Sequence, residues 1–152
     1  MANDGNCFAL SEACDGAGQQ HEVVFGITLG TGCGGGIAIH RQPFVGAWGN
    51  AAECGHITLP GYREQHDGPP VRCYCGKDNC VESFVSGTGL SERYRLFSGQ
   101  HLTGDAIVAL AQQGEPNAVR QVARFRQQLA RTLATVVNLL DPGVIVIGGG
   151  LS

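Results

Sequence analysis

The strongest pattern of apolar and polar positions lies between residues 116 and 140. Apolar side chains recur there at intervals of three and four residues, which is the spacing of one helical face. Pro116 suits the first turn of a helix, and Asp141-Pro142-Gly143 ends the pattern. The pattern predicts one long helix that buries a single broad stripe, made of Val119, Val122, Ala123, Leu129, Leu133, Val136, Val137 and Leu140.

Further apolar runs predict β-strands. Residues 21–29 are rich in β-branched, aromatic and aliphatic side chains, and a second short run at 37–39 follows the glycine-rich residues 30–36, which predicts a hairpin. Residues 144–147 are uniformly apolar, as in strands that are buried on both faces of a sheet. Shorter helices are expected at 7–13, 81–85, 90–96 and 103–112, with an exposed loop at 60–72.

The composition fits one globular domain with a real core. Of the 152 residues, 43% are hydrophobic and 15% are charged, which is typical of globular rather than disordered proteins. The formal net charge of -3 leaves no basic footprint, so we expect no nucleic-acid partner. No apolar run approaches a membrane span and no signal peptide opens the chain, so we expect a cytoplasmic protein without a membrane partner.

One stretch concentrates metal-binding residue types, namely His56, Cys73, Cys75 and Cys80. A Cys₃His set is a common tetrahedral Zn²⁺ site, and short cysteine spacings let one turn deliver several ligands. Gly76 and Asn79 tolerate the positive φ that such a turn requires. The seven cysteines are an odd number, which in a reducing cytosol favours metal ligation over disulfides. Zinc is therefore the preferred interpretation, and buried free thiols or a disulfide are the alternatives.

A polar helix start and two groups of glycines carry further candidate chemistry. Asn3-Asp4-Gly5-Asn6 precedes the first expected helix, and this segment alone favours Asp4 as an N-cap over an anion-binding role. The glycines at 30–36 fit a tight hairpin and a phosphate loop equally well, although the Lys-Ser/Thr of a P-loop is missing. Residues 148–150 are glycines at the end of an apolar strand, where open α/β sheets bind nucleotides.

Five segments, in order along the chain, resemble a known family. They are N-D-G-N-C-F-A at 3–9, L-G-T-G-C-G-G-G at 29–36, E-C-G-H at 53–56, C-Y-C-G-K-D-N-C-V-E at 73–82 and D-P-G-V-I-V-I-G-G-G-L-S at 141–152. On these motifs the chain resembles the ROK family, which groups bacterial sugar kinases with related repressors. Within it, the chain looks most like fructokinases of the manno(fructo)kinase type and N-acetylglucosamine kinases.

The resemblance implies an α/β protein with the actin-like, ribonuclease-H-like ATPase fold, which transfers the γ-phosphate of ATP to a sugar hydroxyl. It implies that Asp4 is the general base rather than an N-cap. The positions that match sugar-hydroxyl ligands are Asn3, Glu53, His56 and Glu82. The phosphate loop matches Gly30, Thr31, Gly32, Gly34 and Gly35, and the adenosine side matches Gly148, Gly149 and Gly150. His56 also matches a zinc ligand, so a structural Zn²⁺ would organise the sugar site.

The resemblance also implies ATP, Mg²⁺ and a sugar as ligands, and a homodimer. The family's D-x-G-G-T phosphate motif and its last helices have no counterpart in the sequence. Residues 1–152 therefore resemble most of the large lobe of one kinase domain, without the N-terminal small lobe and the C-terminal helices. We expect this chain by itself to be inactive. Ala52 and Asn79 also depart from the family, since they stand where relatives carry Gly.

Our interpretation from the sequence is an ATP-dependent hexose kinase of the fructokinase kind. Three alternatives stay open: an N-acetylglucosamine kinase, a fragment of a sugar-responsive repressor of the same family, and a purely structural zinc module. The sequence does not fix the sugar.

Overall fold

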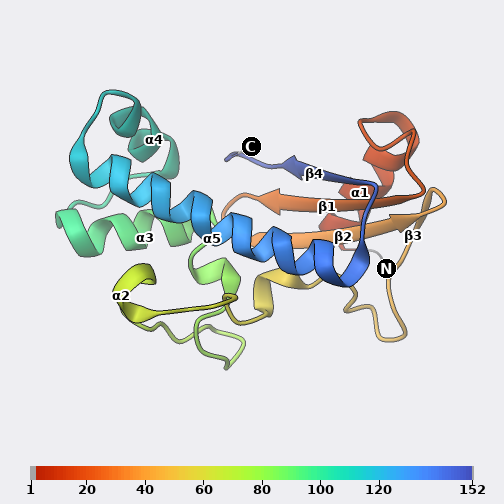
Figure 1. The fold of residues 1–152 in the computed structure, drawn as a ribbon, viewed down its shortest axis with the longest axis horizontal. Helices are drawn as coiled ribbons and strands as arrows, with labels where there is room; N and C mark the ends of the chain where they lie inside the picture. Colours follow the sequence, from red (N-terminus) through yellow and green to blue (C-terminus); the bar gives the residue numbers. More distant parts are fainter. Residues whose placement is uncertain (1–2, 152) are drawn as a thin grey trace.

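The computed structural model describes residues 3–151 as a four-stranded mixed sheet with helices on its two faces (Figure 1). The strands are β1 (Val23–Leu29), β2 (Cys33–Ile39), β3 (Gln42–Pro43) and β4 (Val144–Gly148), in the order β3-β2-β1-β4. β1 pairs antiparallel with β2, from Val23 opposite Ile39 to Leu29 opposite Cys33. β4 pairs parallel with β1, which brings the C-terminal glycines beside the β1–β2 turn.

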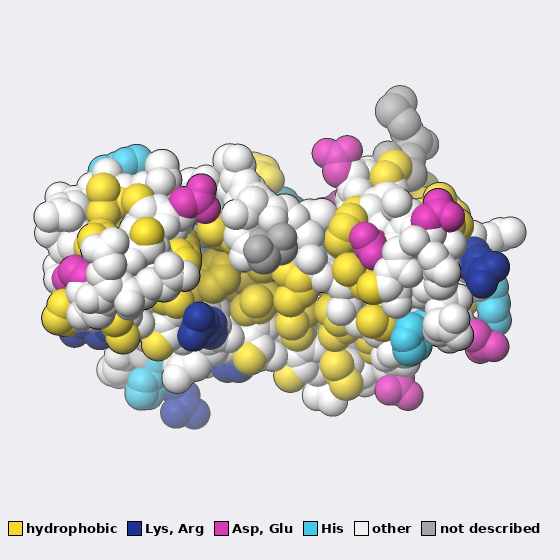
Figure 2. Space-filling view, turned by 90° about the horizontal axis from the view of Figure 1, so that it is seen from above, with side chains coloured by type: hydrophobic (Ala, Val, Ile, Leu, Met, Phe, Trp, Pro, Cys, Tyr) yellow, Lys and Arg dark blue, Asp and Glu magenta, His cyan; other side chains and the backbone are white. Residues whose placement is uncertain are grey.

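The predicted hairpin is confirmed, but its second strand begins earlier than expected. β2 starts at Cys33 instead of residue 37, so three of the glycines join the strand and the turn is only residues 30–32. The prediction that residues 144–147 are buried on both faces is wrong for the part of the chain described. β4 is paired on one side only and is partly exposed, and the Ile147 side chain is 40% exposed. Apolar side chains gather in the middle of the face seen from above, between the α4 end and the sheet end (Figure 2).

The two faces of the sheet carry separate cores because successive strand residues point to opposite sides. α1 (Asp4–Asp15) covers one face, where small residues form a compact cluster of Ala9, Ala13, Val24 and Ala38. The other face carries larger side chains such as Phe25, Ile27 and Leu29, which pack with the helical part of the chain. Small residues under α1 let this helix approach the sheet closely.

The helical part follows the sequence expectations in most places. The long helix α5 spans Pro116–Leu140 as predicted, and α4 (Gly104–Gln112) lies within the expected range. The expected helix at 81–85 is only the 3₁₀ turn η2 (Val81–Ser83). α3 (Gly87–Ser98) begins earlier than expected, because the Ser86 side chain accepts a hydrogen bond from the Gly89 N–H and caps it.

The expected exposed loop at 60–72 is instead anchored to α5. It contains the short helix α2 (Glu64–Asp67), and the Asp67 side chain is buried, with 3% exposed. The carboxylate of Asp67 accepts hydrogen bonds from the side chains of Arg131 and Gln128. An ion pair across 64 residues thus holds the segment that leads to the cysteine cluster. Within residues 3–151, none of the helices combines the length and apolar character needed to cross a membrane.

Candidate functional site

The first turn of α1 lies directly on the glycines of β2. A Cβ atom built on Gly36 would overlap the carbonyl group of Gly5 and would lie 2.6 Å from the backbone nitrogen of Asn6. A Cβ atom built on Gly5 would lie 2.6 Å from the carbonyl carbon of Gly35. Ordinary contacts between carbon and other heavy atoms are about 3.5 Å, so glycine alone permits this approach. Backbone packed on backbone therefore fixes the position of the α1 N-terminus.

Asn3, not Asp4, is the N-cap of α1. Its side-chain oxygen accepts a hydrogen bond from the Asn6 N–H at 2.8 Å, and its side-chain nitrogen donates to Glu53 Oε1 at 2.8 Å. Asp4 is the first residue of the helix and its side chain is exposed. The preference for Asp4 as an N-cap, which the local sequence favoured, is therefore wrong. The Asp4 carboxylate is left available, one residue away from a side chain that binds Glu53.

The segment from Ala52 to His56 lies against the other side of β2. Ala52 has a left-handed backbone, with φ of 67°, and a Cβ atom built on Gly35 would lie 3.0 Å from the Cys54 Sγ. The 3₁₀ turn η1 (Cys54–His56) follows. A Cβ atom built on Gly55 would lie 3.6 Å from the Cβ of Glu82. The turn that carries Glu53 and His56 therefore touches both β2 and the segment that carries Glu82.

Glu82 closes the site beside the β1–β2 turn. Its Oε2 accepts a hydrogen bond from the Cys33 N–H at 2.9 Å, across 49 residues. A Cβ atom built on Gly32 would lie 3.3 Å from the Glu82 carboxyl carbon, so a side chain at Gly32 would press on this carboxylate. The structure thus brings the four predicted sugar ligands, Asn3, Glu53, His56 and Glu82, to one region where α1, η1 and η2 meet β2.

The four predicted metal ligands also come together. Their ligand atoms lie within 4.8 Å of one another. Cys73 Sγ lies 3.7 Å from His56 Nδ1, and Cys75 Sγ lies 3.5 Å from Cys80 Sγ. In a tetrahedral zinc site with Zn–S bonds of about 2.3 Å, neighbouring sulfurs are roughly 3.8 Å apart, so this donor set fits the ion. None of the cysteines, all of which fall in residues 3–151, forms a disulfide.

The turn between the cysteines has the backbone that the sequence predicts. Gly76 has φ of 89° and Asn79 has φ of 56°, both left-handed. The Cys73 N–H donates to the Lys77 carbonyl at 2.9 Å, and the Gly76 N–H donates to the Cys73 carbonyl at 3.0 Å. This tight knuckle, residues 73–80, directs the three thiols toward His56.

His56 has two distinct ring nitrogens in this arrangement. Nδ1 points into the cysteine cluster, whereas Nε2 lies 3.0 Å from the hydroxyl oxygen of Tyr74, outside it. The charge of the nearby Glu82 carboxylate, with some burial, raises the pKa of the Tyr74 phenol. Tyr74 therefore links the cysteine knuckle to one predicted sugar ligand, His56, and lines the same cavity as a second, Glu82. The sequence analysis missed it, because a single tyrosine between two cysteines carries no signal of its own.

One buried thiol near the site stays protonated. The neighbouring Cys54 thiol, together with burial, raises the pKa of Cys33 far above its ordinary value. The Cys33 side chain is therefore neutral beneath the backbone N–H that holds Glu82. In the cysteine cluster, burial and the neighbouring thiols raise the pKa of Cys80 to about 12, so a bound Zn²⁺ would have to displace that proton.

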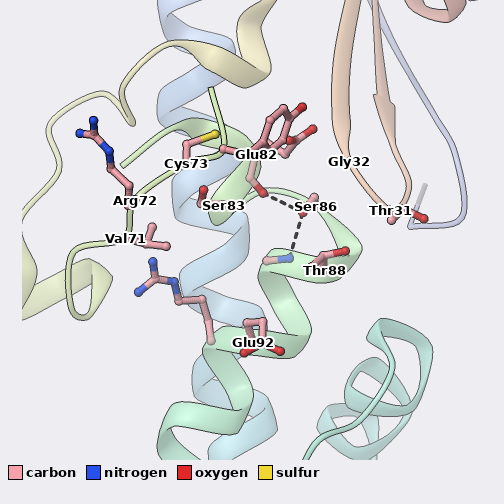
Figure 3. A pocket seen from close by; sticks show the side chains of 13 residues that line it. Thr31, Gly32, Val71, Arg72, Cys73, Glu82, Ser83, Ser86, Thr88 and Glu92 are labelled. Carbon is pink, nitrogen blue, oxygen red and sulfur yellow. Dashed lines mark hydrogen bonds between the residues drawn. The ribbon is translucent and has the colours of Figure 1, made fainter. Parts of the chain in front are cut away.

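Two cavities flank the β1–β2 turn. The first has a volume of ≈ 470 Å³, and Figure 3 shows Thr31 and Gly32 on one side of it and Val71, Arg72 and Cys73 on the other. Its floor carries Glu82 and the capping hydroxyl of Ser86, which donates to the Glu82 carbonyl at 2.7 Å. Glu82 thus belongs both to this cavity and to the sugar-ligand cluster.

The second cavity, of ≈ 520 Å³, lies where the N-termini of α3 and α4 approach the β1–β2 turn. Gly30, Thr31 and Gly150 line it, so the structure unites one predicted phosphate segment with part of the predicted adenosine segment. Helix N-termini offer free N–H groups and a positive dipole end, which suit phosphate. Thr88 lines both cavities and was not predicted, although Ser86-Gly87-Thr88-Gly89 has the composition of a helix start.

The remaining predicted glycines have packing contacts. Gly34 and Gly35 are in β2, where Gly35 faces the Ala52–Cys54 segment. A Cβ atom built on Gly148 would lie 2.6 Å from the Phe8 ring, and one on Gly149 would lie 2.7 Å from the Leu29 carbonyl carbon. These contacts explain why glycine stands there without a ligand. Their roles in nucleotide binding stay predictions.

Comparison with known proteins decides the family. A model of the ROK family matches residues 1–152. The chain belongs to the ROK family. Among curated relatives, the N-acetyl-D-glucosamine kinase of Salmonella paratyphi B is 40% identical over 159 residues, covering 100% of this chain and 51% of that protein. The chain thus spans about half the length of the curated relatives it matches.

Solved structures of other ROK proteins show the same fold. The ROK hexokinase from Thermus thermophilus has a TM-score of 0.86 and 33% identity, and it covers 98% of this chain and 49% of its own. A ROK family glucokinase from Streptomyces griseus, solved in complex with glucose and AMPPNP, has a TM-score of 0.83 and 33% identity, covering 99% of this chain and 52% of its own. The α/β, actin-like ATPase fold expected from the sequence is confirmed.

Proposed function

We propose that the protein to which this chain belongs transfers the γ-phosphate of ATP to a hexose hydroxyl, and that residues 1–152 form most of its large lobe. The observation that carries the proposal is the hydrogen bond between the Asn3 side chain and Glu53 Oε1. It joins the turn that bears Asp4 to the loop that bears Glu53 and His56, so a base and hydroxyl-binding groups stand together. Such a cluster has no purpose in a purely structural zinc module.

N-acetylglucosamine is the sugar that we propose. The interpretation from sequence placed fructose first and N-acetylglucosamine second. The curated relative described above, at 40% identity, is an N-acetyl-D-glucosamine kinase, which favours the second sugar. One related structure is a hexokinase and the other is a glucokinase in complex with glucose, which supports a hexose as the substrate.

Asp4 is the general base in this proposal. Its exposed carboxylate stands at the first turn of α1, beside the Asn3–Glu53 hydrogen bond, where it takes the proton of the attacking hydroxyl. The carboxylates of Glu53 and Glu82 accept hydrogen bonds from sugar hydroxyls, and His56 Nε2 faces the same region. These groups hold the sugar so that one hydroxyl points along the line of phosphoryl transfer.

Nucleotide binding falls to the cavity at the N-termini of α3 and α4. The Gly30-Thr31-Gly32 turn would approach the phosphates with its backbone N–H groups, and Gly150 lies at the adenosine side. Mg²⁺ would accompany ATP and neutralise the charge that develops on the phosphates.

Zinc is proposed for the Cys₃His cluster, because the four ligand atoms gather within 4.8 Å. His56, Cys73, Cys75 and Cys80 would hold it. When bound, Zn²⁺ supplies a structural centre with no open position, not a Lewis acid for the phosphoryl group. Bound zinc would fix the orientation of the His56 ring relative to the sugar.

The test compares two substitutions in the full-length protein, with N-acetylglucosamine and fructose in a coupled ATPase assay. Asp4→Asn should lower kcat by about 10²–10⁴, because a transition-state proton acceptor is lost, with little change in sugar affinity. Glu53→Gln should raise the sugar KM in addition to any loss of kcat, since the hydrogen bonds of Glu53 hold the sugar in the ground state as well as in the transition state.

Near wild-type kcat in Asp4→Asn would mean that the base lies elsewhere. Tight sugar binding without phosphoryl transfer to any hexose would favour the repressor alternative. A larger kcat/KM for fructose than for N-acetylglucosamine would return the specificity to the fructokinase interpretation.

A further inference from the structure

The side chain of Tyr74 combines exposure with a defined polar contact. It lies between two of the proposed zinc ligands, and it is 83% exposed, yet its hydroxyl oxygen is 3.0 Å from His56 Nε2. The two rings meet edge to face, with centroids 5.2 Å apart and planes at 89°. An exposed tyrosine can satisfy its hydroxyl with water alone, so the contact with His56 suggests a specific role for Tyr74.

The direction of this hydrogen bond follows from the other ring nitrogen. His56 Nδ1 points at Cys73 Sγ, at 3.7 Å, inside the cysteine cluster. A histidine that uses Nδ1 as a metal ligand keeps its proton on Nε2, so Nε2–H donates to the Tyr74 oxygen. The phenolic O–H is then free to donate, and the Glu82 carboxylate lines the same cavity as Tyr74. The Tyr74 hydroxyl thus accepts a hydrogen bond from the imidazole and keeps its own proton to donate.

A sugar hydroxyl bound to His56 would accept the same hydrogen bond from Nε2–H. We propose that Tyr74 is a placeholder in the sugar site: its hydroxyl occupies the position of a sugar hydroxyl at His56 Nε2, and it must leave for the sugar to bind. This inference rests on the proposed function, and it adds a residue that controls how readily the sugar enters. The placeholder keeps His56 Nε2 hydrogen-bonded and its ring oriented when the sugar is absent.

The surroundings of Tyr74 permit the ring to move. Little of the ring is buried, so swinging it outward costs little apolar contact. The cavity of ≈ 470 Å³ beside it is lined by Val71, Arg72 and Glu82 as well as by Tyr74, and it offers the ring room to move. The form with Tyr74 on His56 competes with sugar. The measured sugar affinity therefore equals the affinity of the form with Tyr74 displaced, multiplied by the fraction of protein in that form.

The test is Tyr74→Phe in the full-length protein, with Tyr62→Phe as a matched control. Tyr62 loses an equivalent hydrogen bond, from its hydroxyl to the Gly68 carbonyl at 2.8 Å, but it does not touch His56 or Glu82. Calorimetric titration with N-acetylglucosamine should give a Kd about 3- to 10-fold lower in Tyr74→Phe, since one modest hydrogen bond no longer competes. Tyr62→Phe should bind as the wild type does, and zinc content should be equal in all three.

A second measurement follows the His56 ring by ¹⁵N NMR. Without sugar, Tyr74→Phe should shift the His56 Nε2 signal relative to the wild type, and with saturating sugar the two proteins should give the same signal. A residue with only a structural role would leave the difference in place after sugar binds.

The outcomes separate the two proposals. Weaker or unchanged sugar affinity in Tyr74→Phe, with normal binding by the wild type, would overturn the placeholder alone, and weaker binding would show that Tyr74 stays with the sugar. If the wild-type protein bound no hexose at all, the proposed function would fall, and the placeholder with it.

Discussion

Replacing Gly36 by alanine should damage the site through the backbone of α1. The new Cβ atom would lie 2.6 Å from the Asn6 nitrogen and would overlap the Gly5 carbonyl group. Ordinary contact is about 3.5 Å, so the first turn of α1 must retreat by at least about 1 Å. Both atoms belong to the backbone, so no rotamer change can absorb the shift. A displacement of about 1 Å at reacting groups can cost about 10²-fold in rate, and we expect kcat of the full-length Gly36→Ala enzyme to fall by that order.

The control is Gly26→Ala under the same helix. Its new Cβ atom would meet the Phe8 ring at 2.9 Å and the Ala9 side chain at 3.1 Å, past the turn that bears Asp4. Both variants should lose about 1–3 kcal/mol of unfolding free energy through overpacking, measured by chemical denaturation. Only Gly36→Ala should lose about 10²-fold in kcat. Equal kcat losses in the two variants would refute the argument, because instability rather than displacement of Asp4 would then explain both.

Two further predictions concern the metal cluster and the anchor of the loop that leads to it. Metal analysis of protein purified without chelators should find about one zinc per chain, and its removal should lower Tm, because such sites contribute folding energy; a zinc content far below one would contradict the proposed site. Asp67→Asn should lower the free energy of unfolding by about 2–3 kcal/mol. This is less than the ~3–5 kcal/mol lost when a fully buried ion pair is broken, because the Arg131 side chain is 34% exposed. Burial alone would raise the pKa of Asp67, but hydrogen bonds from Arg131, Arg63 and Gln128 outweigh it and lower the pKa. The stabilisation should therefore be complete above the unfolded pKa of about 4 and lost as pH falls through the lower folded value, so denaturation of wild type and variant should converge in acid.

Local patterns predicted the helices and the hairpin because these elements depend mainly on residues that are close together in the sequence. The three- and four-residue spacing of α5, with Pro116 at its start, gave both ends of that helix. The two apolar runs around the glycine-rich residues gave the hairpin, but not where it turns. The sequence analysis assigned Gly34 to Gly36 to a loop. Glycine occurs both in turns and in strands that a helix approaches closely, and the sequence does not distinguish these two cases.

The site was harder to predict because its parts meet only in space. The sequence motifs gave the candidate ligand residues, but the contact of Asn3 with Glu53 spans 50 residues. Ala52 stands in a left-handed conformation, with φ of 67°, which glycine adopts more readily than alanine, and no local signal marks it. The burial of Asp67 by α5 was missed for the same reason, since its partner Arg131 lies on the polar side of a helix and reads as a solvated residue.

A histidine ring shared by the two proposed sites would make their ligands thermodynamically linked. His56 directs Nδ1 to Cys73 and Nε2 to the Tyr74 hydroxyl, in the position that we assign to a sugar hydroxyl. Any factor by which bound zinc strengthens sugar binding must equal the factor by which sugar strengthens zinc binding. In a cell where free zinc is scarce, a supply of the sugar would then help the protein to retain its metal, and a loss of the sugar would make the knuckle easier to strip. The same side chain would then respond both to the supply of the sugar and to the retention of the metal.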